Sequence, residues 1–174
     1  IVRGSDRLLR VRVMDQFGNI VAGDSVRFIV RSGYGNFSGQ DSTSATSDGD
    51  GYAEKLFTSG DTASVNEVTV RLIDSPTDSV TFTINGLPGG ISYYTVVPDV
   101  YSGPVDSATT ATVTAYDVND NVVTTDNSTQ VNFSSTGTRV LLNPTFNTLT
   151  AGVTTFAVSD SAAEQLTVSA QTDG

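Results

Sequence analysis

Apolar and polar residues alternate along the chain in short segments, most clearly in residues 9–13. Leu9, Val11 and Val13 alternate with Arg10 and Arg12, which places the three aliphatic side chains on one face of a β-strand. Such segments recur about every ten residues, with Gly, Asn, Asp and Ser between them, and helical periodicity is absent. The pattern predicts an all-β protein of short strands, as in a β-sandwich.

An internal repeat of this pattern divides the chain into two similar halves. Residues 9–21 match residues 111–123 at an offset of 102, since each holds an alternating strand, an Asp, a turn, an Asn and two aliphatic residues. Further matches follow in the same order: residues 26–28 with 131–133, Gly51 with Gly152, and 68–70 with 166–168. We therefore expect two tandem immunoglobulin-like β-sandwich domains, end to end, over residues 1–87 and 88–174, with about seven strands each.

The repeat register also predicts that each domain lacks one strand. Residues 91–98 read as the first strand of the second domain, and their counterpart would precede residue 1. Residues 79–84 read as the last strand of the first domain, and their counterpart would follow residue 174. Two explanations stay open: the chain is a window from a longer array, or a neighbouring copy supplies the strands by β-augmentation.

Charge narrows the class of partner. The net charge is −10, of which residues 1–87 carry −3 (eight basic, eleven acidic) and residues 88–174 carry −7 (one basic, eight acidic). Such a polyanion disfavours nucleic acid as a partner. No apolar run approaches the roughly 20 residues of a membrane-spanning helix, so we expect no membrane insertion. The chain has no Cys, which excludes disulfides and zinc–thiolate sites.

Residue types that usually carry catalysis are missing. The chain has neither His nor Cys, and its only Lys, Lys55, lies on an expected strand. The usual general bases and nucleophiles are therefore absent. The many aspartates gather in turns, where capping of backbone N–H groups explains them. We expect no enzymatic activity.

Calcium binding is the strongest chemical hypothesis. Asp117, Asn119, Asp120 and Asn121 place several hard oxygen ligands in one loop, and Ca²⁺ takes six to eight oxygens. A site at the junction between the tandem domains could complete the coordination, for example with Asp99 or Asp126. The competing interpretation is a turn built from turn-forming residues. That interpretation also covers the structural turns expected at Asp15, Gly18, Asn19, Asp48 and Gly51. No other cofactor is expected.

Aromatic residues raise the question of carbohydrate binding. The tyrosines considered for stacking on sugars are Tyr34, Tyr52, Tyr93, Tyr94 and Tyr101, but the chain has no Trp. Tyr93 and Tyr94 are adjacent on an expected strand, so they face opposite sides and cannot form one platform. Tyr34 and Phe37 lie in a Gly-rich loop, which we expect either to expose a contact tip or to tuck inwards.

Residues 4–72 resemble the bacterial Ig-like domain, group 1, of invasin- and intimin-type surface proteins. The matching motifs are Asp15-Gln16-Phe17-Gly18-Asn19-Ile20-Val21-Ala22-Gly23, then Val26-Arg27-Phe28, and then Thr46 to Ala53 with Gly51. The second domain is similar in residues 91–98 and 117–123 and departs afterwards.

The resemblance implies a non-catalytic, extracellular or cell-surface structural or adhesion module, such as a spacer or stalk segment beside neighbouring Ig-like domains. The alternatives are a carbohydrate- or host-protein-binding accessory module of a larger secreted protein, or a phage or appendage surface subunit. No host or surface ligand can be named.

Overall fold

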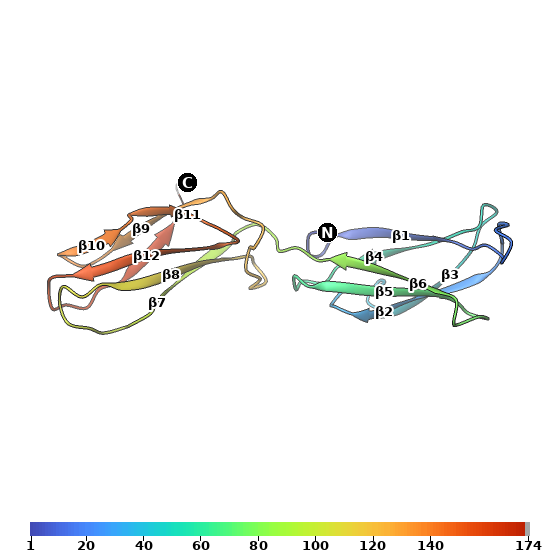
Figure 1. Ribbon diagram of the computed structural model, residues 1–174, viewed down its shortest axis with the longest axis horizontal. Helices are drawn as coiled ribbons and strands as arrows, with labels where there is room; N and C mark the ends of the chain where they lie inside the picture. The colour runs from blue at the N-terminus through green and yellow to red at the C-terminus, as the bar shows by residue number, and fades with distance from the viewer. Residues whose placement is uncertain (173–174) are drawn as a thin grey trace. The chain divides into compact units, whose positions relative to one another are not determined.

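The computed structural model describes residues 1–172, and within them every regular element is a β-strand. The chain divides into two compact units, Ile1–Leu87 (unit 1) and Pro88–Gly174 (unit 2). Each unit contains two antiparallel sheets (Figure 1). The predicted all-β fold of tandem sandwiches is confirmed. Within the described residues, no helix has the length and apolar character needed to cross a membrane.

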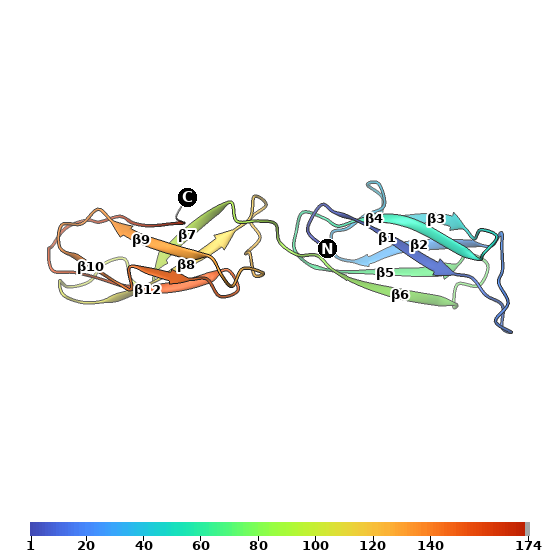
Figure 2. The ribbon, with the colours of Figure 1, turned by 90° about the horizontal axis from the view of Figure 1, so that it is seen from above.

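Unit 1 packs a two-stranded sheet against a four-stranded one (Figure 2). The first sheet pairs β1 (Asp6–Arg12) with β4 (Tyr52–Thr58). The second has the order β3-β2-β5-β6, made of β3 (Ser42–Thr46), β2 (Ser25–Ser32), β5 (Val65–Leu72) and β6 (Ser79–Asn85). Inward-facing alternate residues of both sheets form the core. Its buried members are Leu9, Val13, Val26, Phe28, Phe37, Ala53, Phe57, Val68, Val70 and Ile84.

Unit 2 has the same two-sheet plan with one strand more. One sheet has the order β10-β12-β8-β7, made of β10 (Val140–Asn143), β12 (Val153–Asp160), β8 (Thr109–Tyr116) and β7 (Tyr93–Pro98). The other has the order β11-β9-β13, made of β11 (Phe146–Thr148), β9 (Gln130–Ser135) and β13 (Val168–Gln171). The buried core residues are Ala111, Val113, Ala115, Val123, Val131, Phe133, Leu149, Phe156 and Val158. Within residues 1–172, unit 1 thus has six strands and unit 2 has seven.

Strand pairing corrects one of the repeat matches. In unit 1, Phe28 pairs with Val70, whereas in unit 2 its counterpart Phe133 pairs with Ala170. Ala170 is therefore the counterpart of Val70, and the predicted match of residues 68–70 with 166–168 is wrong by two residues. A shift of two preserves which side chains face inwards, so an alternating pattern alone cannot detect it.

The two units differ in which strand edges are paired. In unit 2, β7 covers the edge of β8, whereas in unit 1 no strand within residues 1–172 pairs with the corresponding edge of β1. Conversely, β6 covers the edge of β5 in unit 1, whereas the corresponding edge of β13 has no strand within the described residues.

Candidate functional site

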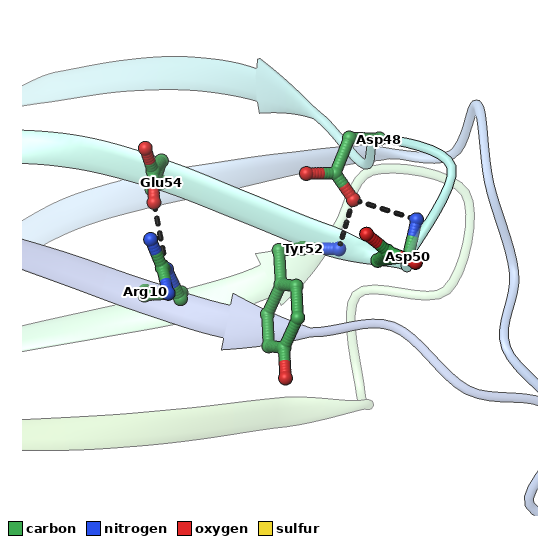
Figure 3. Close-up of polar contacts among 5 residues, drawn as sticks. All are labelled: Arg10, Asp48, Asp50, Tyr52 and Glu54. Carbon is green, nitrogen blue, oxygen red and sulfur yellow. Dashed lines mark hydrogen bonds and ion pairs between the residues drawn. The ribbon is translucent and has the colours of Figure 1, made fainter.

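Three turns of the chain share one hydrogen-bonded geometry, in which an Asp Oδ1 accepts the backbone N–H groups of the second and fourth residues after it. Asp15 Oδ1 lies 2.9 Å from both Phe17 N and Asn19 N. Asp48 Oδ1 lies 2.9 Å from Asp50 N and 2.8 Å from Tyr52 N (Figure 3). Short polar side chains form such local turns because they replace a backbone acceptor.

Asp117 forms the third of these turns, in unit 2. Its Oδ1 lies 2.8 Å from Asn119 N and 3.0 Å from Asn121 N. The third residue after the aspartate has a positive φ in each turn: 84° at Gly18, 77° at Gly51 and 62° at Asp120. Gly adopts this conformation without a steric cost, and Asp tolerates it better than most residues do.

Asp117 and its counterpart Asp15 have different surroundings. Asp117 is fully buried, and its Oδ2 also accepts the Gly89 N–H at 2.8 Å and the Asn121 side-chain amide at 3.0 Å. Asp15 is exposed, and its Oδ2 accepts the Asn19 side-chain amide at 3.0 Å. Asp117 therefore fastens the segment that leads into β7 to the body of unit 2.

The hydrogen bonds set the ionisation of both aspartates. Burial alone raises the pKa of Asp117, but the hydrogen bonds from Gly89 and Asn121 outweigh it and hold that pKa well below its ordinary value. The side-chain amide and backbone N–H of Asn19 likewise lower the pKa of Asp15. Both carboxylates are ionised acceptors at neutral pH.

The four residues of the calcium hypothesis surround the Asp117 turn. Both oxygens of Asp117 accept N–H donors, and the Asn121 amide nitrogen points at them. Asp120 Oδ1 accepts the Tyr93 hydroxyl at 2.7 Å, and that hydrogen bond raises the pKa of Tyr93 to about 12. Within residues 1–172, no group of three or more acidic side chains is arranged to hold a metal ion. Calcium binding here stays a prediction, and the N–H donors favour the capped turn.

Asp126, offered above as an additional calcium ligand, caps a turn of its own. Its Oδ1 accepts the backbone N–H groups of Ser128 at 2.9 Å and Thr129 at 2.8 Å. The Thr129 hydroxyl donates to its other oxygen, and these bonds lower the pKa of Asp126.

A polar cluster on the outer face of unit 1 was not foreseen from the sequence. Arg10 Nε donates to Glu54 Oε2 at 2.7 Å (Figure 3). The guanidinium carbons of Arg10 and Arg12 lie 5.1 and 5.2 Å from the Tyr52 ring centroid. The pairing of Arg10 with Glu54 across β1 and β4 brings them together. Exposed pairs of this kind contribute little to stability. The sequence would have revealed this cluster only if the pairing of β1 with β4 had been known.

The aromatic candidates divide between surface and core. Tyr94 packs against the core of unit 2, whereas Tyr93 lies on the opposite face and stacks on Tyr116 with ring centroids 5.2 Å apart. In unit 1, Phe37 is buried against Phe28 and Phe57, while Tyr34 is 65% exposed. The Gly-rich loop thus tucks its Phe inwards and leaves its Tyr in solvent.

The chain resembles solved structures in its fold. FdeC, described as a broadly conserved Escherichia coli adhesin, matches 100% of the chain with 22% sequence identity and a TM-score of 0.57. The chain has the fold of this bacterial adhesin. It spans 57% of the FdeC chain in that structure. The predicted resemblance to bacterial Ig-like adhesin domains is thereby confirmed for the fold.

Two further solved structures, of intimin and invasin, match with lower TM-scores. The D0-D1 domain of intimin matches 98% of the chain at 18% identity and a TM-score of 0.44, and the chain covers 86% of it. Invasin, titled a bacterial integrin-binding protein, matches 96% of the chain at 19% identity and a TM-score of 0.43, and the chain covers 32% of it. No protein-family model matches the sequence. No curated protein matches it either.

Proposed function

We propose that the chain is a non-catalytic structural and adhesion module of a bacterial cell-surface or filament protein, acting as a spacer or stalk segment. The observation that carries the proposal is the fold shared with the adhesin FdeC over the full length of the chain. The partners of such a module are neighbouring Ig-like domains, and its place is the extracellular or cell-surface space.

The packing of each unit supports a mechanical role. Both units bury large apolar side chains between two sheets, with Phe28 and Phe57 fully enclosed in unit 1 and Val113 and Val131 in unit 2. Antiparallel sheets joined through such a core unfold cooperatively. The hydrogen bond from Gly89 N to the buried Asp117 restricts the conformational freedom of the segment that leads into β7. These features suit a spacer that keeps its length.

The aspartates support the non-catalytic part of the proposal. Asp15, Asp48 and Asp117 each accept two local backbone N–H groups and thereby hold turns. Hydrogen bonds lower the pKa of four carboxyl groups, those of Asp15, Asp117, Asp126 and Glu164. A general acid or base needs a pKa raised towards the working pH, which is the opposite shift.

Single-molecule stretching tests the spacer role. We expect two unfolding events, each releasing about 300 Å of extended chain, because each unit is a separate cooperative body of similar length. A glycan array and a panel of host extracellular proteins, probed with the same chain, test the alternative of a ligand-binding module. We expect no binding. Saturable binding that is lost on replacing the exposed Tyr34 or Tyr101 by Ser would overturn the spacer proposal in favour of that alternative.

A further inference from the structure

Unit 2 contains a large groove beside the open edge of β13. The cavity has a volume of about 1010 Å³ and lies between two walls of the same unit. One wall is the end of β7 with the loop that follows it, residues 96–105, and the other is the segment 162–168. Val100, Tyr101 and Val105 of the first wall are 55%, 82% and 48% exposed. Apolar side chains thus gather at the mouth of an uncovered groove.

Unit 1 shows what occupies the same place. There β6 pairs along β5, with Phe82 opposite Val68 and Ile84 opposite Asn66. Ile84 is buried, and Phe82 is partly buried against the core. Val168 pairs with Ser135 as Val68 pairs with Val30, so Val168 is the counterpart of Val68. Leu166 lies two residues before Val168, as Asn66 lies two residues before Val68, and both Leu166 and Val168 line the groove.

The degree of burial agrees with a missing neighbour. Val68 is fully buried, whereas its counterpart Val168 is only half-buried, although both lie at the same position of their sheets. The difference follows from β6, which covers β5 and has no equivalent beside β13 within residues 1–172.

The segments before β1 in unit 1 and before β8 in unit 2 support the equivalence of the two places. Gly4 in unit 1 and Asp106 in unit 2, 102 residues apart, both have positive φ, 66° and 62°. Gly4 N donates to Ser59 O and Asp106 N donates to Asp160 O, a corresponding bond to the end of β4 or β12.

This segment has a strand partner in unit 1. Val2 forms a parallel bridge with Leu87, directly after β6, and Leu87 N donates to Ile1 O at 2.7 Å. Gly103–Val105, the counterpart of Ile1–Arg3, lines the groove without a bridge or strand partner among the described residues. In unit 2, both walls therefore expose backbone whose counterpart in unit 1 pairs with β6 or with Leu87 after it.

We propose that this groove of unit 2 is a strand-acceptor site that binds an extended segment of the β6 type, antiparallel to β13. The segment carries aliphatic or aromatic side chains at alternate positions, with one side chain over Val168 and the next over Leu166. It carries no acidic residue, because unit 2 has a net charge of −7 and Asp160 and Glu164 line the groove. The segment Ser79–Asn85 meets each requirement, since it is uncharged and alternates Val80, Phe82 and Ile84 with polar residues.

Strand addition provides both affinity and specificity. The backbone of the incoming segment gives affinity through a ladder of hydrogen bonds, and its inward side chains give specificity. The proposal rests on the pairing geometry of the two units and not on the role as an adhesin spacer.

The test uses the whole chain and a labelled synthetic peptide with the sequence of residues 79–87, which has no acidic residue, followed by fluorescence anisotropy and amide hydrogen exchange. We expect saturable one-to-one binding, with new protection at residues 164–170. A peptide in which the residues equivalent to Phe82 and Ile84 are Ser should bind at least about tenfold more weakly, because each loses the burial of a large apolar side chain. A peptide N-methylated at the residue equivalent to Phe82 tests the backbone ladder, because Phe82 lies at a hydrogen-bonded position of the β5–β6 pair, as the bonds of Gly86 N to Ser64 O and Leu72 N to Asp78 O show. This peptide keeps every side chain and should also bind more weakly.

Variants of the chain complete the test. Leu166→Asp places a charge in the groove and should abolish peptide binding, whereas Leu141→Asp, at a 64% exposed position of β10, should leave it unchanged. Circular dichroism establishes that both variants are folded. If Leu166→Asp does not fold, the Ser peptide and the N-methylated peptide on the unaltered chain decide. Equal binding of all three peptides, new protection confined to β5 of unit 1, or no binding of the β6 peptide would each overturn the proposal.

Discussion

Asp117 and Asp15 occupy equivalent turns and should respond differently to substitution. Asp117→Asn replaces one acceptor oxygen by an NH₂ group that confronts the Gly89 N–H or the Asn121 amide. We expect a loss of about 2–3 kcal/mol in the free energy of unfolding of unit 2, because buried donors are left without an acceptor. Urea unfolding measures it. Asp15→Asn is the matched control in an exposed turn and should cost clearly less.

The lowered pKa of Asp117 also predicts how this difference depends on pH. A carboxyl whose native pKa lies below the ordinary value of about 3.9 stabilises the fold fully above about pH 5, and this contribution is lost as the pH falls towards the native pKa. The stability difference between the unaltered chain and Asp117→Asn should therefore shrink between pH 6 and pH 3. A difference that stays constant over this range contradicts the role of the ionised carboxylate.

Ala151 is a second residue with a testable conformational cost. Residues 151 and 152 form a two-residue hairpin turn, in which Thr150 and Val153 exchange backbone hydrogen bonds and both central residues have positive φ, 49° and 77°. Asn before Gly suits this turn better than Ala does. Ala151→Asn should stabilise unit 2 by about 0.5–1 kcal/mol, seen as a higher melting temperature. Ala151→Val, β-branched at a positive φ, should have the opposite effect.

At the scale of the element, β6 is tied to unit 1 by a buried asparagine. Asn66 Oδ1 accepts Tyr34 N at 2.9 Å and Gly35 N at 2.8 Å, and its amide nitrogen lies 3.4 Å from Ile84 O of β6. Asn66→Ala should cost about 3 kcal/mol, because two buried N–H groups lose their acceptor. Thr69→Ala removes a hydroxyl contact between β5 and β6 from an exposed position and should cost less than about 1 kcal/mol.

Hydrogen exchange shows whether Asn66 holds β6 in particular. In Asn66→Ala we expect the amides of residues 79–85 to lose protection before those of β2, since β6 lies at the sheet edge. Uniform loss of protection across all strands of unit 1 would mean that Asn66 stabilises the whole unit without a special role at β6.

The elements also show what the sequence can and cannot predict. The alternation of apolar and polar residues predicted the strands around Leu9 and Phe28 and the all-β fold, because side chains of a half-buried sheet alternate in polarity. The position of β13 was predicted two residues too early, since Leu166 and Val168 fit the same alternation as Val68 and Val70. The turn at Asp117 follows from local residue types, but its burial depends on Gly89, 28 positions away. The groove likewise depends on long-range pairing.

For the molecule as a whole, calcium separates the two interpretations of the loop that holds Asp117, Asn119, Asp120 and Asn121. An extracellular site with a dissociation constant of about 1 mM would stabilise its unit by about 1.4 kcal/mol at about 10 mM Ca²⁺. We expect no change in melting temperature beyond that caused by Mg²⁺ at equal ionic strength, because the oxygens of Asp117 already accept N–H donors. A calcium-specific increase, removed by Asp120→Asn, would establish the site.

The uneven charge of the chain predicts that its two units melt differently. Unit 2 has a net charge of −7, whereas unit 1 has −3, and each unit has one strand edge that no strand within residues 1–172 covers. Self-repulsion destabilises a compact state and is screened by salt, with a Debye length of about 30 Å at 0.01 M and about 8 Å at 0.15 M. Calorimetry should therefore resolve a lower transition from unit 2 that rises with salt more than the upper one. Asp117→Asn assigns the transitions, since it should lower only that of unit 2, while Asn66→Ala should lower only that of unit 1. If the salt-sensitive transition moves with Asn66→Ala instead, net charge does not govern the order of unfolding.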